Sequence, residues 1–314
     1  MKYTKISSVL IFALALFLPV FTSCDKDQST NGTSGQVRLE ITDGPSDDPD
    51  VKAVFITVAE VKIDGQVFDG FSGKKTIDLL TYQQGDVAAL GLGELEAGSY
   101  SQISLVLDTQ TDENGNSPGC YVQTLDNAKH SLSVLASHTV TASNNFVVEA
   151  GSTTELVLDF DLRKAIQYNN SGSEPYSFVG TADLQSALRL VVKSESGNMQ
   201  GTCQNSIILA DKIVAYAYHK GEFDRNTEIS ANNGVAFKNA ISSCAVGPNG
   251  EFNIAFLERG EYEIHFAAYQ DDDQDGDLEF QGTLIVDGLI DLNSIMVSST
   301  TELDLNIMVI GILP

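Results

Sequence analysis

The chain has 314 residues, of which 43 are acidic and 18 basic, and its formal net charge is −25 at pH 7. This length exceeds a single small module, and the negative charge excludes nucleic acid as a partner because the phosphate backbone is anionic as well. Hydrophobic residues make up 42% of the chain, which is enough to build buried cores, whereas Trp is absent and only 4 His occur.

The amino terminus has the layout of a secretory signal peptide. Lys2 and Lys5 precede an unbroken apolar run over residues 9–18, and a proline and two small residues follow before Cys24. This arrangement resembles the lipobox of bacterial lipoproteins, although Phe21 stands where that motif usually has Leu. The resemblance implies that residues 1–23 are cleaved off and that Cys24 carries acyl chains such as palmitate. The alternative, a buried helix with an ordinary cysteine, is disfavoured because such a helix has no polar face.

Residues 24–35 form the lipidated cysteine and a tether. No residue between Cys24 and the end of this segment has an apolar side chain, so we expect it to be flexible. The acidic mature chain is repelled by anionic lipid, which leaves the acyl chains as its only membrane contact. Asp25 resembles both the acidic surface-export tags of some Gram-negative lipoproteins and the inner-membrane retention signal of enteric bacteria. Of the two, we expect the outer membrane, with the protein facing outward.

Downstream, short runs of Val, Ile, Leu, Phe and Tyr alternate with polar residues and are separated by Gly, Asn, Asp and Ser, which predicts an all-β fold. We expect two β-sandwich domains, at residues 36–193 and 205–314, joined by a linker at residues 194–204. Residues 78–92 could hold a turn or two of helix. The alternation that predicts strands is clearest at 37–42, 53–63, 104–107 and 154–158 in the first domain, and at 212–218, 250–257, 262–266, 282–286 and 303–309 in the second.

Both expected domains contain the same kind of corner, at residues 95–100 and 257–262. Each begins with Leu-Glu and has a Gly two positions before a Tyr. Because Gly adopts positive φ without strain, we expect Gly98 and Gly260 to supply that conformation. Such corners recur in unrelated sandwiches, so the repeat is evidence for the fold and not for a duplication.

Four parts of the first expected domain share a pattern with a known family, namely residues 39–45, 54–62, 77–80 together with 95–103, and 156–161. Over about residues 36–192 the chain resembles the bacterial lipoprotein family known as domain of unknown function 4382. Residues 176–190 depart from the family pattern, because this segment is longer and lacks an expected proline. The resemblance implies an envelope-attached β-domain with no assigned reaction.

The second expected domain is similar to transthyretin-like or carboxypeptidase-regulatory-like sandwiches. Residues 250–252 and 257–262 carry this resemblance. It implies a stalk, a spacer or a binding module.

An acidic segment in the second domain has the spacing of a calcium loop. Its carboxylates stand at alternating positions around a glycine, and oxygen ligands without His or Cys select calcium over zinc. Gly282 stands where a helix–loop–helix site has its bidentate Glu, so Glu279 or Asp287 would have to supply the last ligand. Two interpretations stand, a bound calcium ion and a solvated acidic turn. The ligands of the first are Asp271, Asp273, Asp275 and Asp277.

Three further acidic segments are weaker candidates. Residues 112–116 have alternating oxygen ligands but are followed by Ser117 where a calcium loop has its glycine, and residues 47–50 lack the spacing, so both are better explained as turns. Asp159 and Asp161 point to one face of a strand and could form a carboxylate pair for glycoside cleavage. We expect instead that the cations of residues 163–164 neutralise them.

Three cysteines remain besides Cys24 in an oxidising envelope. We expect a disulfide between Cys203 and Cys244, which would stabilise the fold by roughly 3–4 kcal/mol, and a free or buried Cys120. The four His are scattered, with no pair at ligand spacing and no Gly-x-Ser-x-Gly elbow beside them, and no spacing suggests a His positioned for a catalytic Cys.

These features predict a lipid-anchored envelope protein that acts by binding or display and catalyses nothing. We expect no cofactor other than the calcium ion, a membrane contact through the lipid, and a glycan or a protein as ligand. Tyr216 and Tyr218 share a strand face and could stack on sugar rings, although half-buried packing is the commoner role of such a pair. The alternatives are a structural or adhesive surface subunit whose edge strands add to neighbours, and a carbohydrate-active or peptide-cleaving enzyme.

Overall fold

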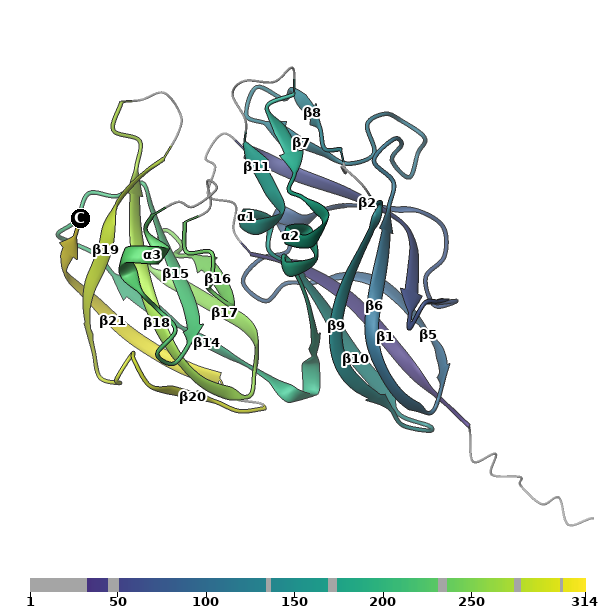
Figure 1. Ribbon diagram of the computed structural model, residues 1–314. Coiled ribbons are helices and arrows are strands. Elements are labelled where there is room, and N and C mark those ends of the chain that lie inside the picture. Colours follow the sequence, from purple (N-terminus) through teal and green to yellow (C-terminus); the bar gives the residue numbers. More distant parts are fainter. Residues whose placement is uncertain are drawn as a thin grey trace, which may run out of the picture. The chain divides into compact units, whose positions relative to one another are not determined.

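The computed structural model describes residues 33–44, 51–133, 137–168, 174–230, 236–273, 278–299 and 302–314. The predicted signal peptide, Cys24 and nearly all of the predicted tether lie outside these residues. The described residues belong to one compact unit and are mostly strands, which confirms the all-β fold class (Figure 1). None of the helices in these ranges is long and apolar enough to cross a membrane.

The first half of the described chain, residues 33–192, contains two large sheets. The smaller of these has four strands in the order β13-β10-β1-β5. β1 and β10 are parallel, and the other two neighbouring pairs are antiparallel. Because Ser34 and Gly35 already belong to β1, the predicted tether ends earlier than expected. The strands are β1 (Ser34–Asp43), β5 (Ala88–Glu96), β10 (Thr153–Phe160) and β13 (Leu188–Val192).

The larger sheet of the first half has seven strands, with the order β8-β7-β2-β6-β9 and with β3 and β4 also paired to β2. The strands are β2 (Val51–Ile63), β3 (Gln66–Val67), β4 (Lys75–Asp78), β6 (Gly98–Leu107), β7 (Tyr121–Thr124), β8 (Lys129–Ser131) and β9 (Thr139–Val148). A separate hairpin and three short helical segments complete this half. They are β11 (Ile166–Tyr168) with β12 (Tyr176–Phe178), and η1 (Leu79–Thr81), α1 (Leu162–Ala165) and α2 (Thr181–Ser186).

One hydrophobic core fills the space between these two sheets. On β1, Val37, Leu39 and Ile41 are fully buried, while the residues between them face outward or lie half-buried. They join apolar side chains of β2, β6 and β9 in a single cluster. Because burying one such side chain contributes about 1.5–3 kcal/mol, the alternating pattern determines which face of each strand turns inward.

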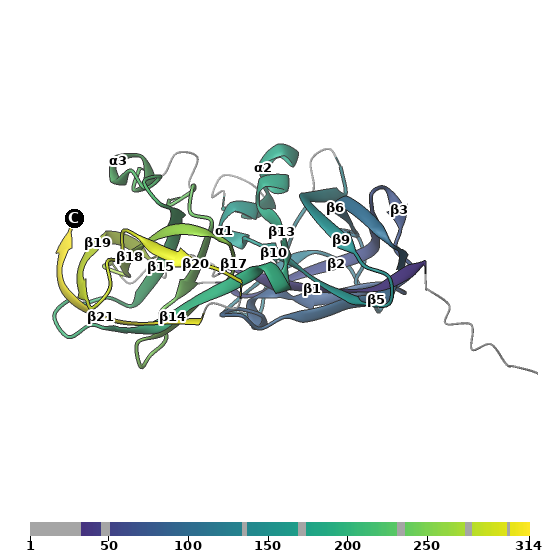
Figure 2. The same ribbon diagram turned by 90° about the horizontal axis from the view of Figure 1, so that it is seen from below.

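The second half, residues 193–314, is built on one eight-stranded sheet in the order β16-β15-β18-β19-β21-β14-β17, with β20 paired to β18 (Figures 1 and 2). β16 also contacts β17, so the two ends of the sheet meet around one core. The strands are β14 (Ser196–Gln204), β15 (Lys212–His219), β16 (Ser242–Ala245), β17 (Glu251–Glu258), β18 (Gly260–Gln270), β19 (Glu279–Gly288), β20 (Ile295–Val297) and β21 (Glu302–Leu313), and the helices are η2 (Lys193–Glu195) and α3 (Arg225–Glu228).

The linker predicted at residues 194–204 is wrong. η2 begins directly after β13, and the following residues form β14, which pairs with both β21 and β17. The sequence of this segment is typical of a polar linker, because few of its side chains are apolar. Met199 and Cys203 are the main ones that pack in the core. Gly201 adds to that impression, yet a Cβ on it would lie 1.9 Å from the carbonyl oxygen of Leu305, so the strand requires a glycine there.

The two corners at residues 95–100 and 257–262 have the same hydrogen bond. In each, the tyrosine hydroxyl donates to the carbonyl of the residue four positions earlier, at 2.8 Å in the first and 2.9 Å in the second. The expected glycine conformation is wrong, since neither Gly98 nor Gly260 has a positive φ. A Cβ on Gly260 would lie 3.2 Å from the Tyr262 ring, so this glycine makes room for the ring that closes the corner.

Candidate functional site

A polar groove of about 660 Å³ lies where strands of the first half meet a loop of the second half. Its walls come from β9, the end of β10, α2 and β13 on one side and from residues 238–241 on the other. Although the whole chain is strongly acidic, the groove contains the cations Lys164, Arg189 and Lys238 beside Asp159 and Asp161. The contacts in this groove therefore decide whether Asp159 and Asp161 could act as a catalytic carboxylate pair.

Strand register places Asp159 against a cation. Asp159 on β10 is the direct partner of Arg189 on β13, and the Arg189 Nη2 atom lies 2.6 Å from Asp159 Oδ2. The other guanidinium nitrogen, Nη1, donates to the carbonyl oxygen of Phe256 in the second half at 2.8 Å. Arg189 thus joins the two halves while it neutralises Asp159.

The Phe256 carbonyl is available to Arg189 because β17 has an irregularity at this point. The register between β14 and β17 shifts, and Phe256 has a φ of 56°. A non-glycine residue in this region costs of order 1–3 kcal/mol and persists only where its surroundings hold it. Here Ala255 and Phe256 pack against Val157 and Val191 of the first half, which makes a small apolar contact next to the ion pair.

Asp161 lies between two cations that also bind the second half. Its Oδ2 atom is 2.8 Å from Arg163 Nη2 and 3.3 Å from Lys164 Nζ. Arg163 Nη1 donates to the carbonyl oxygen of Phe237 at 3.3 Å, and Lys164 Nζ donates to that of Ala240 at 2.6 Å. The side chain of Arg163 is 0% exposed, so this is a buried ion pair.

Burial and charge act in opposite directions on these groups. Burial works to raise the pKa of Asp161, but the nearby charges of Arg163 and Lys164 outweigh it and the pKa is lowered. Burial lowers the pKa of Lys164, and the charge of Asp161 opposes that shift. Asp43, close by on β1, has a pKa well above its usual value because it is buried and faces the charge of Asp161. These surroundings therefore favour the ionised form of Asp161 and the protonated form of Asp43.

The arrangement in the groove is that of a structural joint. Cleavage of a glycoside needs one carboxyl group that donates a proton and a second one free to act on the substrate or on water. Here Asp159 and Asp161 each contact a cation, and those cations are held by carbonyl groups of the second half. The expectation that a cation of residues 163–164 neutralises Asp161 is confirmed, whereas Asp159 is paired with Arg189 instead.

The predicted calcium ligands are described only in part. Asp275 and Asp277 lie outside the described residues, as do residues 47–50. The Asp271 N–H donates to Asp211 Oδ2 and the Asp272 N–H to Glu279 Oε2, both at 3.0 Å. Among the described residues no group of three or more His, Cys, Asp or Glu could hold a metal ion, so calcium binding by Asp271, Asp273 and the two others stays a prediction.

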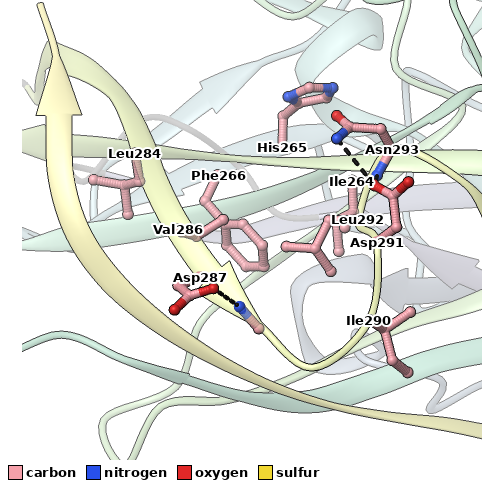
Figure 3. A pocket seen from close by; sticks show the side chains of 11 residues that line it. Ile264, His265, Phe266, Leu284, Val286, Asp287, Ile290, Asp291, Leu292 and Asn293 are labelled. Atoms are coloured by element: carbon pink, nitrogen blue, oxygen red, sulfur yellow. Dashed lines mark hydrogen bonds between the residues drawn. The ribbon is translucent and has the colours of Figure 1, made fainter.

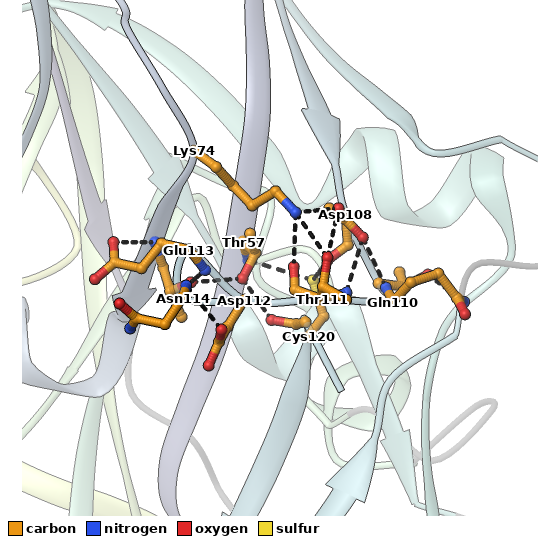
Figure 4. Close-up of polar contacts among 12 residues, drawn as sticks. Thr57, Lys74, Asp108, Gln110, Thr111, Asp112, Glu113, Asn114 and Cys120 are labelled. Atoms are coloured by element: carbon orange, nitrogen blue, oxygen red, sulfur yellow. Dashed lines mark hydrogen bonds and ion pairs between the residues drawn. The ribbon is translucent and has the colours of Figure 1, made fainter. Parts of the chain in front are cut away.

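The segment at residues 112–116 is a hydrogen-bonded turn (Figure 4). Asp112 Oδ1 accepts the N–H groups of Asn114 at 2.9 Å and of Asn116 at 2.8 Å, and Asn116 Nδ2 donates to Asp112 Oδ2 at 3.1 Å. These bonds give the side chains of Asp112 and Asn116 a role in the turn itself. Lys74 holds the preceding part of the loop, because its Nζ atom lies 2.5 Å from Asp108 Oδ2.

The structure contradicts the predicted disulfide between Cys203 and Cys244, because it has both as buried free thiols. Both belong to the core of the second half, where a thiol packs as a small apolar side chain. Sequence position indicates that they share a domain, but a bridge also requires matching Cβ directions, which spacing does not provide. Cys120 is buried as expected, and its Sγ atom accepts the Thr57 N–H at 3.3 Å.

Tyr216 and Tyr218 are fully buried and cannot serve as a platform for sugar rings. Both faces of β15 are covered, since these tyrosines point away from the main core into a second cluster with Phe237. The Tyr216 ring stacks on Phe237 with centroids 4.1 Å apart, and the Tyr218 hydroxyl donates to Glu228 Oε2 at 2.8 Å. The commoner, packing role of such a pair is confirmed.

A cavity of about 310 Å³ lies beside β18 and β19 in the second half (Figure 3). It is lined by apolar side chains together with His265, Asp287 and Asp291. Asp291 Oδ1 accepts the N–H of Asn293 at 3.0 Å and its Nδ2 at 3.1 Å, so this carboxylate stabilises the turn before β20. Burial lowers the pKa of His265, although Glu263 opposes the shift.

Sequence reasoning missed the groove, and in particular Arg189. No local pattern marks Arg189, because its partners Asp159 and Phe256 are far away along the chain and are brought to it by strand register and by the irregularity in β17. The run from Asp159 to Lys164 was the available signal, since two acids followed by two cations at the end of a buried strand already suggested mutual neutralisation.

Comparison with solved structures gives only weak likenesses. A minor pilin, GBS52 of Streptococcus agalactiae, is 11% identical, with 88% of this chain and 98% of that chain covered and a TM-score of 0.18. The shaft pilin SpaA of Lactobacillus rhamnosus GG is 11% identical, with 90% and 100% covered and a TM-score of 0.20. For the Bacillus anthracis TIE protein the identity is 11%, the TM-score 0.18 and the coverage 88% of this chain but only 34% of that one. TM-scores this low do not establish a shared fold.

No curated protein matches the chain. The resemblance expected for residues 36–192 is confirmed over most of that range, whereas the likeness of the second half to transthyretin-like sandwiches is not shown. The matched part covers β1 to β12, which includes Asp159, Asp161 and Arg163 but not Arg189. Residues 34–178 match the model of the family described as "Domain of unknown function (DUF4382)".

Proposed function

We propose that the mature chain is a lipid-anchored protein of the cell envelope that acts as a non-catalytic binding and display module, facing outward from the outer membrane. The observation that carries the proposal is the pairing of Asp159 and Asp161 with cations that also bind the other half. The two carboxylates that the sequence offers as a catalytic pair are used instead to join two β-structures. Such a joint suits a protein that holds a binding surface in a fixed orientation.

The beginning of the fold supports the anchored role. β1 starts at Ser34, so only a short polar segment separates it from Cys24. A lipid on Cys24 would therefore hold the described unit close to the membrane surface. The net charge of −25 keeps the protein itself off anionic lipid, so its surfaces stay available to a ligand.

The second candidate is a structural subunit that assembles by strand addition. The contacts at the edge of β5 disfavour it. Strand addition needs a row of free backbone groups at a sheet edge. Lys75 Nζ donates to the carbonyl groups of Ala89 and Leu90 at 3.2 and 2.7 Å, and the Leu92 N–H donates to Gly70 at 3.1 Å. Because residues 70–75 occupy this edge, these contacts disfavour strand addition at β5.

The test is labelling of producing cells with a palmitate analogue, followed by protease treatment of the intact cells. We expect the wild type to take up the label and to be cleaved from outside, and the variant Cys24→Ser to take up none. Cys120→Ser is the matched control, because this buried thiol should have no part in lipidation. The proposal fails if Cys24→Ser is labelled like the wild type, or if intact cells protect the chain from the protease.

A further inference from the structure

A small cavity with an aromatic wall lies at the end of the first half. Its volume is about 380 Å³, within the range of small-molecule sites. It opens between the turn that joins β7 to β8 and the hairpin of β11 and β12. Leu125 and Asp126 line it from the turn, His130 from β8, and Tyr168 and Tyr176 from the hairpin.

The aromatic wall is held in place by a buried ring. Tyr168 and Tyr176 are direct partners across the hairpin, and their ring centroids lie 5.2 Å apart. Tyr176 also contacts the ring of His130 at 5.5 Å. Since Tyr176 is only 4% exposed, it fixes the two rings on either side of it.

Tyr168 is the aromatic residue that this cavity offers to solvent. It is 50% exposed and is the only aromatic residue among the large exposed hydrophobic side chains of the described ranges. Elsewhere in those ranges the aromatic rings lie wholly or largely within the cores, as Tyr216 and Tyr218 do. A half-exposed tyrosine that lines a cavity and rests on a buried partner provides a flat apolar surface at little cost in conformational entropy.

Polar groups stand beside this surface. Asp126 Oδ1 accepts the Thr124 hydroxyl at 2.6 Å and the Ala128 N–H at 2.9 Å, so the carboxylate is fixed in position. Both bonds end on Oδ1, which leaves the lone pairs of Oδ2 for another donor. His130 Nε2 lies 3.5 Å from the Thr124 hydroxyl, and the imidazole adds a group that can donate or accept.

We propose that this cavity binds a neutral sugar residue, with the C–H face of the ring on Tyr168 and its hydroxyl groups on Asp126 and His130. A sugar ring has an apolar face and a rim of hydroxyl groups, which matches a flat aromatic surface next to fixed polar atoms. Acidic sugars are excluded, since the ligand would meet the Asp126 carboxylate on a chain of net charge −25. The proposal rests on the binding role given above and names the class of ligand.

A quaternary ammonium ligand is the main competitor, because such cations also bind aromatic side chains. That mode relies on several ring faces around one cation. Here Tyr176 is only 4% exposed, so Tyr168 is the one aromatic side chain of this cavity that is exposed to solvent. The geometry therefore favours a sugar.

The test is titration of the full-length protein, kept in a detergent without sugar headgroups, with neutral oligosaccharides. The probes are glucan, galactan, mannan, xylan and N-acetylglucosamine oligomers, and tetramethylammonium is the competing probe. Binding is measured by isothermal titration calorimetry, because Tyr168→Ala would remove one of the 10 Tyr and with it part of the fluorescence that reports on this cavity. We expect at least one oligosaccharide to bind, and Tyr168→Ala to weaken it by about tenfold or more, equivalent to about 1.4 kcal/mol.

Two further variants make the result specific. Tyr168→Phe keeps the ring and should bind within about threefold of the wild type, whereas Asp126→Asn should weaken binding without changing the circular dichroism spectrum. Leu209→Ala, at an 82% exposed position in the second half, is the control and should have no effect. The proposal is overturned if no oligosaccharide binds, if Tyr168→Ala binds like the wild type, or if only tetramethylammonium binds. Palmitate labelling is read independently, so failure here is distinguishable from failure of the anchoring proposal.

Discussion

The guanidinium carbon of Arg163 lies 5.1 Å from the centroid of the Tyr216 ring, although Arg163 belongs to the first half of the chain and Tyr216 to the second. The same guanidinium contacts Asp161 at 2.8 Å and donates to the carbonyl oxygen of Phe237 at 3.3 Å. Its charge is thus shared between a carboxylate of one half and an aromatic cluster of the other. The two cores are coupled through one buried cation.

Removal of this cation should destabilise both halves together. In Arg163→Ala, Asp161 keeps only Lys164, and a buried carboxylate that loses a partner typically costs about 3–5 kcal/mol. We expect this loss in the free energy of unfolding, measured by urea titration. Arg163→Met, which restores the apolar stem, should recover only part of it.

The control for Arg163 is Arg259→Ala, an exposed position where the change should stay within about 0.5 kcal/mol. Equal stability of Arg163→Ala and Arg259→Ala would show that the joint has no energetic role.

Asp43 should make the protein less stable as the pH rises. Burial, with the charge of Asp161 as the second cause, holds the pKa of Asp43 well above the usual 3.8. Below pH 3.8 the carboxyl is protonated in both states and its contribution to stability is fully present. As the pH rises to the raised pKa, the folded state keeps a proton that the unfolded state gives up, so the free energy of unfolding falls.

The measurement for Asp43 is urea unfolding of the wild type and of Asp43→Asn between pH 4 and pH 8. The amide stays neutral and its oxygen can still accept the Leu162 N–H, which Asp43 Oδ1 accepts at 3.2 Å. We expect the variant to gain stability relative to the wild type as the pH increases. The exposed Asp69→Asn should run parallel to the wild type. A constant difference between Asp43→Asn and the wild type would contradict the raised pKa.

How far the fold can be predicted from the sequence depends on how far apart along the chain the interacting residues lie. The alternation of apolar and polar residues determines which face of a strand such as β1 is buried, because neighbouring residues in a strand point to opposite faces. All the expected strands are present. The sequence reading failed at β14, where a polar, glycine-containing strand looks like a linker until its partners β17 and β21 are known. Tertiary pairing overrides local composition there.

In the groove, too, contacts between residues close in sequence could be predicted, whereas contacts made by strand pairing could not. Neutralisation of Asp161 was predictable, since Arg163 and Lys164 follow within one helical turn. Arg189 was not predictable, because only the pairing of β10 with β13 brings it to Asp159. The alternation at residues 216 and 218 is compatible with an exposed tyrosine pair, but both faces of that strand are covered. The exposed tyrosine is Tyr168, in a short hairpin without any pattern of its own.

The three described thiols should be unreactive in the folded protein. Burial raises the pKa of Cys120 and Cys244 to about 12 and that of Cys203 to about 11, so the reactive thiolate is scarce at pH 8. We expect Ellman's reagent to find no thiol in the native protein and three per chain in guanidinium chloride. One thiol after unfolding would mean that Cys203 and Cys244 form a bridge after all. Four would mean that Cys24 carries no lipid.

Calcium binding by the acidic segment around Asp273 should make the stability of the protein depend on calcium. If Asp273 and its neighbours bind calcium, the ion at about 100 times its Kd stabilises the folded state by about 2.7 kcal/mol. We expect calcium to raise the melting temperature of the full chain relative to a chelator, and Asp273→Asn to abolish most of the difference. Asp112→Asn is the control, because the oxygens of Asp112 are occupied by its own turn. Equal melting temperatures in calcium and in chelator would leave the solvated acidic turn as the interpretation.

Lys74 should control the acid sensitivity of the loop at residues 108–120. The hydrogen bond from Lys74 is the largest cause that lowers the pKa of Asp108 to about 2, and the N–H groups of Gln110 and Thr111 add to it. The depressed pKa contributes stability that is present above pH 3.8 and is lost as the pH falls towards 2. In Lys74→Met we expect the pKa of the Asp108 carboxyl, followed by NMR, to rise from about 2, because the largest cause that lowers it is lost while burial, which raises it, remains. The control is Lys52→Met, which removes an exposed lysine that is hydrogen-bonded to Asn127 and should leave the pKa of Asp108 unchanged. If the pKa of Asp108 is also unchanged in Lys74→Met, the backbone donors alone account for its low value.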